Sequence, residues 1–136
     1  MRNSKGTMRK SSVKKTQGGR GLALACAGDA AEKKAENILV LDMREISSVA
    51  DYFVICSGAS TRQVRAIAES VVEEAKKRGT HCPHSEGWRD GSWVVLDFID
   101  VIVHVFHGDT RQYYQIERLW GDAKKVKSSR PKAESV

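Results

Sequence analysis

The chain has 136 residues, of which 40% are hydrophobic, and a formal net charge of +6 at pH 7. This size and composition fit one domain with a single core rather than two domains. No run approaches the roughly 20 apolar residues that span a bilayer, and no secretory signal is visible, so we expect a cytoplasmic protein that contacts no membrane. The three cysteines show no CxxC spacing, which argues against a disulfide framework.

The positive charge is concentrated at the two ends of the chain. Residues 1–28 contain seven Lys or Arg and no acid, and residues 124–136 contain five Lys or Arg and one Glu. Residues 29–123 hold 16 acidic and 11 basic residues and are therefore acidic. An acidic domain should attract basic protein surfaces, whereas basic tails could contact RNA without sequence selectivity. The alternative is that both tails are only solubilising ends.

The first predicted segments are a basic extension and a helix. Residues 1–21 offer too little apolar surface to offset the entropy of ordering, so we predict a disordered N-terminal extension. An organelle transit peptide is the alternative. Residues 22–36 are rich in Ala and predict a helix. The folded domain is therefore placed at residues 22–123, and residues 124–136 are predicted to be a basic C-terminal tail.

Two short runs of β-forming residues come next. Residues 38–41 and 52–57 predict buried strands, and Gly58 ends the second. Residues 44–51 between them fit either a strand extension or a hairpin loop, because their periodicity favours neither.

The clearest helix signal follows Gly58. Ser60 and Gln63 have the spacing of a capping box, in which each side chain satisfies a backbone N–H of the first turn. Apolar residues then recur with a helical period, Lys and Arg gather at the end, and Gly79 stops the pattern. We predict an amphipathic helix between Ser60 and Gly79.

The second half of the chain predicts a hairpin and a last helix. Residues 80–91 are polar, and residues 93–98 and 101–106 predict an antiparallel β-hairpin. Asp109 and Gln112 repeat the capping-box spacing and should begin a short helix. Helices interspersed with strands predict an α/β fold with a mixed β-sheet flanked by helices.

The sequence contains residues of types used in catalysis but no complete active-site motif. Residues 58–60 could hold a phosphate at a helix N-terminus, but neither GxxxxGK[ST] nor GxGxxG is present. Metal-capable side chains lack the spacing of familiar zinc sites: His81, Cys82, His84, His104 and His107. Cys56 lies in a predicted buried strand, where a thiol is usually inert. Four aspartates could be imagined to bind a divalent metal, but turns and strand ends explain them as readily: Asp42, Asp51, Asp97 and Asp100. We predict no catalytic residue, no cofactor and no metal.

Alternation along one predicted strand brings an aromatic and an acidic residue together. Side chains two apart in a strand point to the same side, so Trp93 and Asp97 share one face of the sheet. This combination is typical of a contact with a partner that carries Lys or Arg. The alternative is that Trp93 belongs to the core.

Several strings, in order over about residues 30–123, resemble those of the Iojap, or ribosomal silencing factor, family. The strings are Ser47-Ser48-Val49-Ala50-Asp51-Tyr52-Phe53-Val54-Ile55, Ser57-Gly58, Arg62-Gln63-Val64, Glu86-Gly87, Trp93-Val94-Val95-Leu96-Asp97, Asp100-Val101-Ile102-Val103-His104-Val105-Phe106, Tyr113-Tyr114 and Leu119-Trp120. The resemblance implies a nucleotidyltransferase-like fold without catalysis. It also implies a translational repressor that binds ribosomal protein uL14 on the large ribosomal subunit. Bound there, the protein would block association with the small subunit and lower translation under starvation or in stationary phase.

The resemblance and the sheet geometry together suggest the contact residues. We expect the partner-binding residues to be Trp93, Asp97, Glu86, Tyr114 and Asp51, with Trp93 burying apolar area and the acids pairing with Lys or Arg. The basic tails depart from the family's compact pattern and could touch ribosomal RNA. A homodimer is compatible with exposed sheet edges.

Two other functions stay open on the residues alone. One is an active nucleotidyltransferase-like enzyme that uses Ser60 and carboxylates such as Asp51. The other is a general RNA-binding adaptor driven by the tails, whose affinity should fall steeply with salt.

Overall fold

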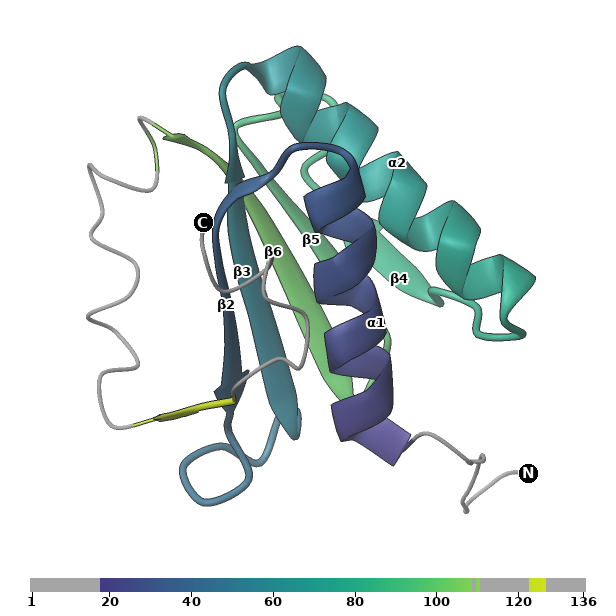
Figure 1. Cartoon of the computed structure of the whole chain (residues 1–136), viewed down its shortest axis with the longest axis vertical. Coiled ribbons are helices and arrows are strands. Elements are labelled where there is room, and N and C mark those ends of the chain that lie inside the picture. Colours follow the sequence, from purple (N-terminus) through teal and green to yellow (C-terminus); the bar gives the residue numbers. More distant parts are fainter. Residues whose placement is uncertain (1–17, 109, 111–122, 127–136) are drawn as a thin grey trace.

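The computed structural model describes residues 18–108, 110 and 123–126, which form one sheet and two helices with defined bounds (Figure 1). In chain order the elements are α1 (Gly18–Glu32), β2 (Glu36–Asp42), β3 (Tyr52–Gly58), α2 (Thr61–Lys77), β4 (His84–Glu86), β5 (Trp93–Asp97), β6 (Val101–His107) and β7 (Lys124–Lys125). The strand order is β4-β5-β6-β3-β2-β7. β3 and β6 are parallel and the other pairs are antiparallel, which confirms the predicted α/β fold with a mixed sheet.

Helices α1 and α2 lie on the same face of the sheet (Figure 1). The predicted apolar stripe of α2 packs on the sheet: Val64, Ile67, Ala68, Val71 and Ala75 are buried, and Val72 is half-buried. Helix α1 packs beside it mainly through small residues: Ala23, Cys26, Ala27, Ala30 and Ala31. Alternate residues of the strands complete this core, among them Val54, Val94, Leu96, Val103 and Val105. The other face of the sheet is therefore built from the remaining alternate residues.

The predicted cap at Ser60 is confirmed, and the reciprocal bond from Gln63 goes to Ala59, one residue before the N-cap. Ser60 Oγ accepts a hydrogen bond from the Gln63 N–H at 3.1 Å, and Gln63 Oε1 accepts one from the Ala59 N–H at 2.6 Å. Gln63 Nε2 also donates to the carbonyl oxygens of Lys33 and Lys34. One side chain thus caps α2 and ties it to the α1–β2 connection.

The bounds of the first helix differ from the prediction of residues 22–36. Helix α1 begins at Gly18 because its first turn packs on the sheet, where a β-carbon at Gly19 would lie 3.0 Å from the Tyr52 ring. It ends at Glu32, and Lys34 then adopts a φ of 68°, which turns the chain into β2. Helix propensity does not report such tertiary contacts.

Three other regions extend or correct the sequence reading. Residues 44–51 form the β2–β3 connection rather than a strand. Strand β4 was missed, since its three residues are polar and depend on pairing with β5. Within residues 124–136, predicted to be a tail, β7 pairs with the end of β2. Gly108 and Thr110 are helical, but the rest of the helix predicted from Asp109 lies outside the described residues.

We predict that Ser60→Ala lowers the free energy of unfolding by about 1 kcal/mol, because the Gln63 N–H loses its acceptor. Urea denaturation followed by circular dichroism measures the change. Ser60→Asp keeps an acceptor at this position and should stay within a few tenths of a kcal/mol of the wild type. Equal losses in both variants would show that the loss of stability does not come from the missing acceptor.

Candidate functional site

Strand register places a set of aromatic, acidic and apolar side chains on the sheet face opposite α1 and α2. In the β5–β6 pair, Trp93 lies opposite Phe106, and Asp97 lies opposite Ile102. Paired residues point to the same side of a sheet. We call this surface the Trp93 face, and define it by His84 and Glu86 of β4, Trp93, Val95 and Asp97 of β5, Ile102, His104 and Phe106 of β6, Phe53 and Ile55 of β3, and Leu39 and Leu41 of β2.

The most exposed part of the Trp93 face lies on β4 and β5, and Leu39 of β2 is half-buried. Its centre is buried, as Phe53, Ile55, Ile102 and Phe106 form a second core cluster with residues of β2 and its following loop. His84 and Glu86 are exposed, and Val95 and Asp97 are half-buried. A partner that approached the described residues from this side would therefore meet β4 and β5 first.

Trp93 is both anchored and exposed. Its Nε1–H donates to Nδ1 of His104 at 3.2 Å, and its ring lies 4.8 Å from the Phe106 ring, centroid to centroid. The side chain nevertheless remains 38% exposed. Trp93 is therefore both a core residue and a surface residue. One side of its indole packs against the protein, and the rest is accessible to a partner.

His104 acts as a neutral anchor beneath Trp93. Burial lowers the pKa of its imidazole to about 4. The ring also packs against Phe53, with centroids 4.8 Å apart. A neutral imidazole has one nitrogen that can accept a hydrogen bond, and here Nδ1 accepts from Trp93. The indole orientation therefore depends on a part-buried hydrogen bond to a buried imidazole.

Tight backbone packing fixes the connection that leads into β5. Gly87 has a φ of 93°, and a β-carbon there would collide with the carbonyl oxygen of Trp93. The Gly87 carbonyl accepts from the Gly91 N–H at 2.9 Å, which closes the turn. Glycine at position 87 therefore lets this turn sit against the backbone of Trp93.

Two carboxylates border the apolar part of the Trp93 face, each with a local partner. Glu86 Oε2 lies 3.0 Å from Nε2 of His84, and both side chains are exposed. Asp97 Oδ1 accepts a hydrogen bond from the Ile99 N–H at 2.8 Å, which stabilises the β5–β6 turn. Asp97 thus has a structural role, and its second oxygen is the atom through which it could meet a partner.

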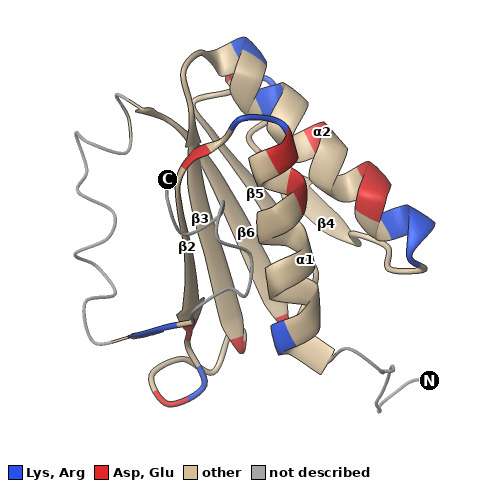
Figure 2. Ribbon diagram, in the orientation of Figure 1, with Lys and Arg blue, Asp and Glu red and all other residues tan. Residues whose placement is uncertain are grey.

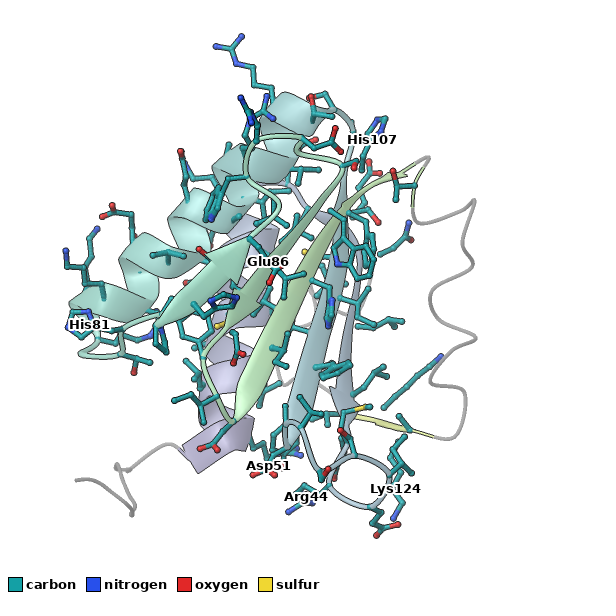
Figure 3. All side chains as sticks on the ribbon, turned by 180° about the vertical axis from the view of Figure 1, so that it is seen from behind. Arg44, Asp51, His81, Glu86, His107 and Lys124 are labelled. Atoms are coloured by element: carbon teal, nitrogen blue, oxygen red, sulfur yellow. The ribbon has the colours of Figure 1, made fainter. Side chains whose placement is uncertain are left out.

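The structure brings three of the five predicted contact residues onto one face. Trp93, Asp97 and Glu86 share the Trp93 face, which Figure 3 shows with Glu86 labelled. Asp51 instead lies at the end of the β2–β3 loop, just before β3, and the same loop carries Arg44 (Figure 3). Ser57 and Trp93 both pair with Phe106, and Asp51 comes six residues before Ser57. At the rise of a β-strand, Asp51 therefore lies about 20 Å along the sheet from Trp93. Tyr114 lies outside the described residues. Contact with a partner stays a prediction for all five.

Sequence reasoning overlooked the role of His104. The signal was available only in part: Ile102, His104 and Phe106 alternate in one strand and must share a face. Which face, and opposite which residues of β5, depends on the register between two strands. The histidine was therefore weighed as a metal ligand instead of as a partner for Trp93.

Several residues considered for catalysis have structural roles in the described part of the chain. Cys56 is fully buried, and Ser60 caps α2. The Asp42 carboxylate is bound by Arg44 through Oδ2 at 2.7 Å, and this contact lowers the pKa of Asp42 to about 2. Within residues 18–108, 110 and 123–126, no group of three or more His, Cys, Asp or Glu is arranged to hold a metal ion. The described helices include none long and apolar enough to cross a membrane.

We predict that lowering the pH from 7 to 5 removes about 2 kcal/mol of stability through His104 alone. The unfolded chain takes up a proton at its ordinary pKa of 6.5, whereas folded His104 resists protonation until the pH nears 4. The contribution is therefore complete above pH 6.5 and is lost as the pH falls. Urea unfolding at both pH values measures it, with His104→Gln as the reference. An equal pH dependence in both proteins would contradict this assignment.

Comparison with known proteins places the chain in a family. The family described as "Ribosomal silencing factor during starvation" matches residues 16–136. The ribosomal silencing factor of Bacillus subtilis is 52% identical over 92 residues, which are 68% of this chain and 78% of that protein. The chloroplastic Iojap protein of Zea mays is 32% identical over 101 residues, covering 74% of this chain and 44% of that protein.

A crystal structure from Chromobacterium violaceum shares the fold. It superposes with a TM-score of 0.71 at 34% identity, covering 86% of this chain and 94% of that one. Sequence and structure therefore agree with the resemblance found in the ordered strings. The chain belongs to the ribosomal silencing factor family.

Proposed function

We propose that this protein is a non-catalytic translational repressor of the cytoplasm. It binds ribosomal protein uL14 on the large ribosomal subunit through the Trp93 face and sterically blocks association with the small subunit, which lowers translation under starvation or in stationary phase. The observation that supports this most strongly is the exposed, anchored Trp93 between acidic residues, in a chain of the ribosomal silencing factor family.

The chemistry of the Trp93 face favours a basic protein partner. A tryptophan that is partly exposed on a sheet can bury a large apolar area with few torsions to fix, which is the profile of an interface hot spot. Glu86 and Asp97 border it and can form charge-assisted hydrogen bonds with Lys or Arg. An acidic surface should also steer a basic partner toward it.

The anchoring of Trp93 lowers the entropic cost of binding. Its indole is already held by His104 and packed on Phe106, so little rotamer freedom remains to be lost. The same contacts stabilise the free protein and should persist in the complex. A small surface can therefore bind with useful affinity.

The basic ends of the chain support a secondary contact with ribosomal RNA. Lys124 and Lys125 are exposed on β7, the basic strand at the sheet edge beside β2 (Figure 2). Cations that neutralise phosphates add affinity that falls with salt and carries little sequence selectivity. This contact would strengthen binding beside uL14 without replacing the Trp93 face.

We predict that Trp93→Ala weakens binding to purified large subunits by roughly 30-fold or more, as expected for an interface hot spot. Glu86→Gln should weaken it by a few-fold and reduce its salt dependence, because it removes one charge from the rim of the face. Cosedimentation at several salt concentrations measures both effects. Glu73→Gln is the matched control, since Glu73 is exposed on α2, away from the Trp93 face. Wild-type affinity in folded Trp93→Ala would contradict the proposal.

Asp97 requires two substitutions, because it also stabilises the β5–β6 turn. Asp97→Asn keeps an oxygen that can accept from the Ile99 N–H and removes only the charge, whereas Asp97→Ala removes both. Weaker subunit binding in Asp97→Asn, with unfolding unchanged, is expected from a partner contact. A defect limited to Asp97→Ala would assign this residue to the turn alone.

A further inference from the structure

Exposed apolar side chains gather at the end of the molecule where β3 and β6 begin. Among the described residues four large hydrophobic side chains are exposed, and one of them is Trp93. The other three are Ile46 at 47%, Val49 at 70% and Ile99 at 66%. Single exposed apolar residues are ordinary, but a group of them marks an interaction site.

Backbone hydrogen bonds join the two loops that carry these side chains. The N–H groups of Asp51 and Tyr52 both donate to the carbonyl oxygen of Asp100, at 2.8 and 3.1 Å. The Met43 N–H donates to the Asp51 carbonyl at 2.8 Å and closes the β2–β3 loop. The loops therefore form one surface, which we call the loop end and define as residues 46–51 with residues 99 and 100.

The loop end carries negative charge that its nearest cation only partly offsets. Asp51 and Asp100 are both exposed. Burial and the nearby Asp100 carboxylate raise the pKa of Asp51. Arg44 is the neighbouring cation, and its guanidinium is bound to both carboxylate oxygens of Asp42. A partner with Lys or Arg would therefore find two carboxylates beside apolar side chains.

The backbone at Ile99 holds its side chain outward at a conformational cost. Ile99 has a φ of 81°, a left-handed conformation that β-branched residues rarely adopt. Two hydrogen bonds keep the turn closed. Asp97 Oδ1 accepts from the Ile99 N–H, and the Phe98 carbonyl oxygen accepts from the Asp100 N–H at 3.0 Å. Glycine would adopt this conformation without strain. An exposed isoleucine at position 99 therefore adds no local stability to the folded state.

We propose that the loop end is a second docking surface, which takes a basic protein segment with apolar side chains on the large ribosomal subunit. It is continuous with the Trp93 face through Asp97, whose carboxylate holds the turn that presents Ile99. Asp51 then belongs to this surface rather than to the contact around Trp93. The inference rests on the proposed function, because it extends the same docking event.

The test is the affinity of the double variant Val49→Ser/Ile99→Gly for purified large subunits. We expect a roughly tenfold loss of affinity, because two apolar contacts are removed. Its unfolding midpoint should be unchanged or higher, since Ile99→Gly relieves the backbone at that position. Asp51→Asn should separately reduce the salt dependence of binding. Ala66→Ser, on the exposed surface of α2, is the control and should bind as the wild type does.

The outcomes separate this inference from the proposed function. If the double variant binds with wild-type affinity, the loop end is not a docking surface, and the proposal for the Trp93 face is unaffected. A double variant that binds large subunits normally but loses self-association in sedimentation would assign the loop end to a second copy of the chain, which also overturns the inference. Absence of binding by the wild type would instead contradict the proposed function.

Discussion

Strand β6 is the element on which the rest of the structure depends. It pairs in parallel with β3 and antiparallel with β5, and six of its seven residues are buried. Alternate residues of β6 therefore serve two cores: Val103 and Val105 pack under the helices, and Ile102 and Phe106 pack on the opposite side. A one-residue slip against β5 would exchange these faces and remove Trp93 from His104.

That register also builds the proposed recognition surface on the β5–β6 hairpin. It sets a buried, neutral His104 opposite Val95 and within hydrogen-bond distance of the Trp93 indole. Stability and the proposed binding thus depend on the same contacts, because residues that fill the second core also orient the exposed side chain of Trp93. The proposed steric exclusion requires such a fixed surface and no reactive group.

Local patterns were sufficient to predict the capping box at Ser60, the amphipathic α2 and the β5–β6 hairpin, because each depends on residues close in sequence. Strand β4 and the role of His104 could not be predicted, since both arise from pairing between separate segments. Asp51 was grouped with Trp93 by family resemblance, whereas the structure sets it at the loop end. The alternation that joined Trp93 and Asp97 was enough to place both on one face.

Subunit joining is the measurement that tests the central claim most directly. Light scattering of mixed small and large subunits should show that the wild-type protein slows and reduces joining, whereas Trp93→Ala at the same concentration leaves it near the level without protein. The same excess of Glu73→Gln should inhibit as the wild type does. Joining that proceeds normally while wild-type protein is bound to the large subunit would contradict steric exclusion.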